Sequence, residues 1–185
     1  MLDTTIRTYA TRQLGRVLAA VIAIATLFGL GGHGSARPGS TIVSSETVVH
    51  GSARVVDGDT IDVAGTRIRL EGIDAPEAGQ TCGRADGQTW SCGWAATRTL
   101  ERLVGAGQVR CASKGNDRHG RMLGQCWSAD NRELNAEMVR LGLAWAFVRF
   151  SREYVALETA ARAAKVGVWQ GASQPAWEYR AHTMR

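Results

Sequence analysis

The stretch over residues 54–77, RVVDGDTIDVAGTRIRLEGIDAPE, holds six carboxylates and three arginines among β-forming residues. Asp57 and Asp59 stand in the turn motif DGDT, and Asp74 and Glu77 follow the run RIRLEGI. Like charges gathered in one place repel one another unless a cation lies between them. Ligand sets made only of oxygen favour a hard ion such as Ca2+ or Mg2+. The sequence therefore predicts a divalent cation site built from these acids.

The acids do not form an EF-hand loop. Counted from Asp57, the sixth position is Asp62 rather than glycine, and the twelfth is Ile68 rather than glutamate. Taken alone, DGDT is also compatible with a plain hairpin turn, because Asp-Gly supplies a positive φ at low energetic cost. The surrounding residues must decide between a turn and a site.

Two arginines favour a site. Arg69 alternates with Ile68 and Leu70 and therefore leaves the opposite face of its strand, and Arg121 follows Gly120 in the loop DRHGR. A guanidinium beside acids is often only a surface salt bridge. Beside a cation held by carboxylates it can instead clamp a phosphate through two parallel hydrogen bonds. A cation, arginines and a spare carboxylate suit phosphodiester hydrolysis, whose transition state gains negative charge and needs an aligned water.

The hydrophobic pattern supplies elements that can position these residues. Alternation predicts three meandering strands, and a three-strand meander brings the DGDT turn and residues 74–77 to the same end of a sheet. Apolar residues at helical spacing predict a helix over 93–104, a short helix over 134–141 and a third helix from a Ser151 cap to Lys165. The expected strands are 47–56, 60–63, 67–73, 109–113 and 121–128, with a loop over 75–93.

Five short strands with a helix between the third and fourth predict an α+β, mainly β fold: a five-stranded OB-fold barrel with three α-helices. An open α+β sheet is the alternative. The C-terminal tail, with PAWEYR at 175–180, is expected to pack back on the body.

The N-terminal part of the 185-residue chain has the pattern of a secretory signal. Arginines precede an apolar run over 17–30, and the small residues Gly34 and Ala36 follow it. We predict a signal peptide over 1–36, a linker over 37–46 and one folded domain over 47–185, secreted or periplasmic. An uncleaved membrane anchor is the alternative. The net charge of +5 is a weak basic bias, compatible with a polyanionic ligand without identifying one.

The four cysteines agree with export. They lack the C-x-x-C spacing of many zinc sites, and an even number of cysteines in an exported chain predicts two disulfides. Of the three possible pairings we favour Cys82–Cys92, which closes a short loop, with Cys111–Cys126, which would join two strands of a hairpin.

Three motifs together resemble the staphylococcal nuclease (thermonuclease) family. They are VVDGDT, RLEGIDAPE, and HGR followed by LNAEMVRLGLAW, in the family's order and approximate spacing over about residues 47–170. The resemblance implies a five-stranded OB barrel with three helices and Ca2+-dependent cleavage of DNA and RNA to 3'-phosphate ends. It also implies a monomer. Separately, cleavage of the predicted signal would leave a domain with no stable membrane association.

The resemblance implies a role for each candidate residue. Asp59 and Asp74 would bind calcium through their carboxylates and Ala75 through its backbone carbonyl, with Asp57 as a supporting acid nearby. Glu77 would orient or deprotonate the attacking water.

The arginines have a separate role in this resemblance. Arg69 and Arg121 would hold the phosphate and stabilise its charge, with Arg121 towards the departing 5'-oxygen. Ala75 and His119 stand where the type member has a threonine and a tyrosine, and Val148 falls where a second tyrosine is expected. Stacking on the bound nucleotide is therefore expected to differ from that of the type member.

Two other functions are compatible with the same fold. One is a nucleic-acid-binding module without catalysis, which is disfavoured because Asp59, Asp74, Glu77, Arg69 and Arg121 are all present. The other is a secreted interaction domain in which the acids bind calcium for stability alone. The main prediction is a calcium-dependent endonuclease of low sequence specificity that acts on DNA, RNA or both.

Overall fold

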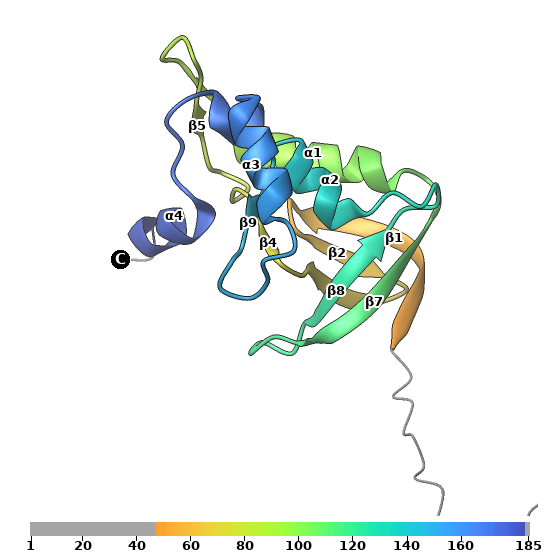
Figure 1. Ribbon diagram of the computed structural model, residues 1–185. Coiled ribbons are helices and arrows are strands. Elements are labelled where there is room, and N and C mark those ends of the chain that lie inside the picture. The colour runs from red at the N-terminus through yellow and green to blue at the C-terminus, as the bar shows by residue number, and fades with distance from the viewer. Residues whose placement is uncertain (1–46, 184–185) are drawn as a thin grey trace, which may run out of the picture. The chain divides into compact units, whose positions relative to one another are not determined.

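The computed structural model describes residues 47–183, which contain a closed five-stranded barrel (Figure 1). The barrel order is β1-β2-β3-β8-β7. Its strands are β1 (Val48–Asp57), β2 (Thr60–Val63), β3 (Thr66–Leu70), β7 (Gln108–Asn116) and β8 (Met122–Trp127). The prediction of an α+β barrel is confirmed. The predicted signal peptide over 1–36 and linker over 37–46 lie outside the described residues.

The barrel closes through one parallel and several antiparallel pairings. β1, β2 and β3 form the antiparallel meander, β3 pairs with β8 in parallel, and β7 pairs with both β8 and β1. In the β2–β3 ladder Ile61 lies opposite Ile68, and Thr60 lies opposite Arg69. Ile68 and Leu70 are buried while Arg69 is only partly buried, as the alternation along β3 predicts.

The third predicted strand is interrupted. We expected it to run to residue 73, but β3 ends at Leu70 and the chain turns at Gly72, whose φ is 74°. Glycine adopts this left-handed conformation without the steric penalty of a side chain. The chain then forms β4 (Ile73–Asp74), which pairs with β9 (Trp145–Ala146) in a separate two-stranded sheet. The break carries Asp74 out of the barrel ladder and into a buried position.

The helices depart from the prediction at two places. α1 (Cys92–Val104) and α2 (Leu134–Arg140) agree closely with it, whereas α3 (Val155–Ala163) begins three residues late, with Tyr154 rather than Ser151 at its N-cap. The Ser151 hydroxyl accepts a hydrogen bond from the Glu153 N–H at 3.2 Å, so Ser151 caps a turn that precedes the helix. Beyond the 3-10 turn η1 (Gly167–Gln170), the tail forms an additional helix, α4 (Ala176–Thr183).

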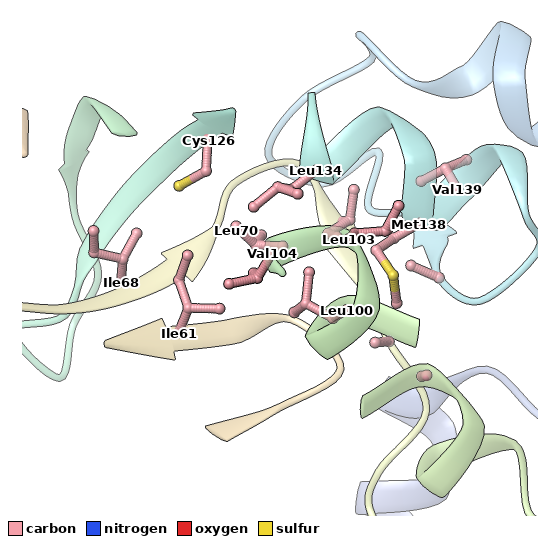
Figure 2. Packing of buried hydrophobic residues seen from close by; sticks show 14 of the residues in the cluster. Ile61, Ile68, Leu70, Leu100, Leu103, Val104, Cys126, Leu134, Met138 and Val139 are labelled. Carbon is pink, nitrogen blue, oxygen red and sulfur yellow. The ribbon is translucent and has the colours of Figure 1, made fainter. Parts of the chain in front are cut away.

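The main core lies between the barrel and the first two helices. Figure 2 shows the strand residues Ile61, Ile68 and Leu70 together with side chains from α1 and α2. The α1 residues Ala96, Leu100, Leu103 and Val104 are buried, as their i, i+4, i+7, i+8 spacing predicts. Burying each large aliphatic side chain contributes about 1.5–3 kcal/mol, so this core fixes the strands that carry the acids. Among residues 47–183, no helix is long and apolar enough to cross a membrane.

Both predicted disulfides are confirmed. Cys111 and Cys126 lie directly opposite each other in the β7–β8 pairing. Cys82–Cys92 joins the region predicted as a loop, which contains a small hairpin of β5 (Cys82–Gly83) and β6 (Thr89–Trp90), to the start of α1. This second disulfide belongs to a smaller core together with Trp145, Val168 and Ala176 of α4.

Candidate active site

The turn between β1 and β2 holds Asp59 in a buried position. The Asp57 carboxylate accepts the Asp59 N–H at 3.0 Å and closes the turn. Asp59 is 5% exposed, and its Oδ2 accepts the backbone N–H of Ala75 at 3.1 Å. Its Oδ1 accepts a hydrogen bond from the Thr60 hydroxyl at 3.1 Å. The predicted metal residues Asp59 and Ala75 are therefore in direct contact.

Arg69 joins the two candidate aspartates. Its Nη1 donates to Asp59 Oδ1 at 2.7 Å, and its Nη2 donates to Asp74 Oδ1 at 2.6 Å. Asp74 has no exposed surface, and its backbone pairs with Trp145 between β4 and β9. The structure thus gathers the acids of the β1–β2 turn and of β4 around one guanidinium, as the meander predicts.

Glu77 is fixed through its backbone and leaves its carboxylate partly exposed. Its N–H donates to Gln80 Oε1 at 3.1 Å, and its side chain is 41% exposed. The first turn of α1 presses against it: a Cβ added at Gly93 would lie 1.6 Å from the Glu77 carbonyl oxygen. Only glycine fits at this contact, so the start of α1 sets the position of the Glu77 backbone.

Arg121 approaches from the loop between β7 and β8. Its Nε donates to Asp117 Oδ2 at 2.7 Å, and its N–H donates to Asp117 Oδ1 at 3.0 Å. These contacts, with the hydrogen bond from the His119 N–H to Asp117 Oδ1 at 2.8 Å, order the loop. The Arg121 side chain keeps 31% of its surface exposed, which leaves part of the guanidinium open to a ligand.

A further arginine, Arg180 of α4, was not predicted. Its Nη2 donates to Asp74 Oδ2 at 2.9 Å, and its Nη1 donates to Glu77 Oε1 at 2.6 Å and to Asp74 Oδ1 at 3.2 Å. Arg180 and Asp74 are 106 positions apart, and the sequence between them gives no local sign of the contact. The available signal is the helical character of the tail, with Glu178 in its first turn and Arg180 in its last.

These residues surround one cleft of about 1020 Å³. Aromatic side chains form part of its wall, with Phe147 stacked on Trp177 at a centroid distance of 5.5 Å. His119 also lines the cleft, as expected for a residue near a bound nucleotide. Val148 is 55% exposed, and the neighbouring wall is made instead by Phe147, Arg149 and Phe150. From the candidate set, Asp59, Arg69, Ala75, Glu77 and Arg121 line the cleft, with Asp74 buried behind Arg69 and Arg180.

Comparison with known proteins assigns the family. The family model described as "Staphylococcal nuclease homologue" matches residues 67–171, more than half of the chain. The chain belongs to the staphylococcal nuclease family. The matched domain is accordingly a hydrolase domain of the nuclease type.

Relatives similar to this chain include proteins named as an endonuclease and a micrococcal nuclease. Over 140 residues the chain is 39% identical to an uncharacterized endonuclease of Escherichia coli O157:H7, covering 71% of this chain and 85% of that protein. It is 32% identical over 144 residues to the micrococcal nuclease of Shigella flexneri, covering 69% and 77%. It is 34% identical over 134 residues to the succinoglycan biosynthesis protein ExoI of Rhizobium meliloti (strain 1021), covering 72% of this chain and 62% of that protein.

Burial and neighbouring charges perturb the acids of this family site. Burial raises the pKa of Asp59 to about 7; Arg69 opposes the rise, and the charges of Asp57 and Asp74 add to it. The pKa of Arg180 is raised because the hydrogen bonds and charges of Asp74 and Glu77 outweigh its own desolvation. The site therefore contains buried acids whose repulsion calls for nearby positive charge.

The donor atoms suit a hard cation, but their present contacts do not leave them free. Carboxylate oxygens are the ligands that Ca2+ and Mg2+ prefer, and the staphylococcal nuclease family is generally metal-dependent. Yet every carboxylate oxygen of Asp59 and Asp74 accepts a hydrogen bond from the protein itself. Within residues 47–183, no group of three or more His, Cys, Asp or Glu side chains is arranged to hold a metal ion. The chemistry fits a cation, provided that arginine contacts are exchanged for it.

Proposed function

We propose that the chain is an exported, calcium-dependent endonuclease that hydrolyses phosphodiester bonds of DNA, RNA or both with little sequence specificity and leaves 3'-phosphate ends. The observation that carries this proposal is the Arg69 bridge between Asp59 and Asp74 in a cleft that Glu77 and Arg121 also line. Acids, a partly exposed carboxylate and two arginines thus face the same space. This is the combination that in-line attack of water on a phosphodiester requires.

The cation would be held by the most buried acids. Asp59 and Asp74, with the backbone carbonyl of Ala75, are the proposed ligands, which supply oxygen only. When bound, Ca2+ would add positive charge against the phosphate and so lower the energy of the transition state.

Glu77 is the proposed base or orienting group for water. It is the most exposed of these acids, since 41% of its side chain is accessible, and can therefore reach a water in the cleft. Gln80 and the start of α1 hold the Glu77 backbone, so the point from which its side chain extends into the cleft is fixed.

The two arginines would bind the phosphate from different directions. Arg69 comes from β3, where it bridges Asp59 and Asp74, and Arg121 comes from the β7–β8 loop. Asp117 holds the Nε side of Arg121, which leaves its terminal nitrogens available for a phosphate oxygen. Placing positive charge on opposite sides of a phosphate stabilises the charge that develops in the transition state.

An extracytoplasmic location, secreted or periplasmic, is part of the proposal. The leader pattern over 1–36 supports it, and so do the two disulfides, because such bonds persist mainly in oxidising compartments. The same leader retained as an anchor would place the domain on the same side of the membrane.

A cleavage assay tests the proposal. Purified protein is incubated with single-stranded DNA or RNA in the presence of Ca2+, with and without excess EGTA, and the product ends are analysed. Chelator-sensitive cleavage to 3'-phosphate ends is the expected result. Equal cleavage with and without EGTA would exclude the calcium mechanism. Chelator-resistant binding without product would favour a binding module, and a calcium-dependent rise in Tm without cleavage would favour a calcium-stabilised interaction domain.

A further inference from the structure

Arg180 occupies the acidic site as a cation would. Its guanidinium spans two acids, with both oxygens of Asp74 and one oxygen of Glu77 accepting its hydrogen bonds. Asp74 has no exposed surface, so Arg180 and Arg69 supply the positive charge that offsets its burial. A divalent cation binds carboxylate oxygens at about 2.3–2.6 Å. The oxygens that face Arg180 are therefore ones that a cation at Asp74 would need.

Aromatic and apolar packing, through Trp177 and Ala176, holds α4 in place. Trp177 stacks on Phe147 with an interplanar angle of 20° and packs edge-on against Trp145 at 6.2 Å. Ala176 is fully buried in the smaller core, next to the Cys82–Cys92 disulfide. The contact between α4 and the acids is thus built by aromatic packing and does not depend on Arg180 alone.

The buried side chain of Gln80 links the segment before α4 to the loop that carries Glu77. Gln80 has no exposed surface; its Nε2 donates to the Gln174 carbonyl at 2.6 Å, and its Oε1 accepts the Glu77 N–H at 3.1 Å. The segment that leads into α4 and the loop that carries the proposed base are therefore fixed by one side chain. A buried amide that uses both its donor and its acceptor specifies a single arrangement of the groups it joins.

We propose that Arg180 is a built-in counter-ion that competes with the divalent cation for Asp74 and Glu77, so that α4 sets the calcium affinity of the site. The inference rests on the cation-dependent function proposed above and adds a regulatory element to it. With Arg180 bound, its charge offsets part of the charge of the two acids, and α4 contributes Trp177, Arg180 and Ala181 to the wall of the cleft. Exchange of Arg180 for the cation frees Glu77 to meet water and leaves the arginine tethered at the cleft.

Calcium binding to the purified full chain tests the competition independently of activity. Isothermal titration calorimetry compares the wild type with Arg180→Gln and with Trp177→Ala, which loosens α4 but keeps the arginine. Arg180→Gln is expected to raise the Ca2+ affinity by about tenfold or more, the effect of removing a charge-assisted pair with a buried acid. Trp177→Ala is expected to raise it by a smaller factor. Ca2+ should also raise the Tm of Arg180→Gln by more than that of the wild type.

Arg149→Gln is the matched control, because Arg149 lines the same cleft and carries the same charge. Its Ca2+ affinity should stay within about twofold of the wild type. An arginine that does not compete for Asp74 and Glu77 affects the ion only at a distance, where solvent and salt screen its charge. An equal rise in Arg149→Gln and Arg180→Gln would overturn the competition in favour of a general field effect. Circular dichroism verifies folding, and if Arg180→Gln does not fold, an unchanged affinity in Trp177→Ala overturns the proposal.

The cleavage assay separates the two proposals. If cleavage is chelator-sensitive but Arg180→Gln does not raise the Ca2+ affinity, the competition by Arg180 is overturned and the proposed function is kept. A weaker affinity in that variant would mean, in addition, that Arg180 holds Asp74 and Glu77 in position for the ion. No Ca2+ binding by any variant, with cleavage that ignores EGTA, would overturn both proposals.

Discussion

Arg69 of β3 lies across the ladder from Thr60, and from that position its Nη1 reaches the neighbouring Asp59 at 2.7 Å. The same guanidinium contacts Asp74 at 2.6 Å, and the side chains of the two acids are 7% and 0% exposed. A group proposed to bind phosphate therefore also stabilises the fold. Changes at this arginine should affect stability before any substrate is added.

Arg69→Gln is expected to lower the free energy of unfolding by about 3 kcal/mol, because it leaves Asp59 and Asp74 buried with less compensating charge. Arg69→Lys keeps the charge but cannot make the same pair of contacts, so its loss should be smaller. Urea denaturation of the metal-free protein measures both. A wild-type midpoint for Arg69→Gln would show that the acids are not stabilised by this bridge.

Arg121→Ala is expected to lower kcat by about 10²–10³, the typical effect of removing one group that stabilises transition-state charge. Glu77→Gln should also lower turnover strongly, because the amide cannot accept a proton from water. Both variants should keep the fold, since each side chain is partly exposed. Arg140→Ala, on the outer face of α2, is the control with unchanged turnover. Wild-type rates in Arg121→Ala or Glu77→Gln would refute the proposed roles.

Much of the fold follows from short-range patterns. Period-two alternation identified the barrel strands, and the spacing of Leu100, Leu103 and Val104 identified α1. The disulfide pairing followed from loop length and hairpin geometry. The grouping of Asp59 with Arg69 was also accessible, because a meander fixes which turns share an end of the sheet.

The features that were missed depend on backbone conformation or on distant contacts. The break after Leu70 depends on a left-handed conformation at Gly72, and an isolated Glu-Gly pair inside an alternating run does not reveal it. The contact of Arg180 with Asp74 joins positions 106 residues apart, through a helix with only weak amphipathic character. Long-range pairings of this kind depend on tertiary packing, which a single sequence does not encode locally.

The perturbed pKa of Asp59 predicts a dependence of stability on pH. The carboxyl has a pKa of about 7 when folded against a reference value of 3.8, so the folded state binds its proton more tightly. Its contribution to stability is complete below about pH 4 and is lost as the pH rises through about 7. Metal-free wild type should therefore lose stability relative to Asp59→Asn between about pH 5 and pH 8. Denaturation at both pH values tests this, and a constant difference would contradict it.

Asn135 connects α2 to the barrel strands that position the site. It is fully buried at the start of α2, where its Nδ2 donates to the Glu71 carbonyl at 2.9 Å and to the Gly124 carbonyl at 3.0 Å. Its Oδ1 accepts the Cys126 N–H at 3.1 Å. One side chain thus ties α2 to β8 and to the segment that follows β3.

Asn135→Ala should lower the free energy of unfolding by about 3 kcal/mol, because two buried backbone groups and one partly buried group lose a hydrogen-bond partner. Asn135→Asp should be similarly destabilised at neutral pH, since its second oxygen would face the Glu71 and Gly124 carbonyls. Exposed Asn116→Ala is the control, with an expected change within about 0.5 kcal/mol. Chemical denaturation gives all three values. If Asn135→Ala and Asn116→Ala behaved alike, α2 would be held to the barrel by apolar packing alone.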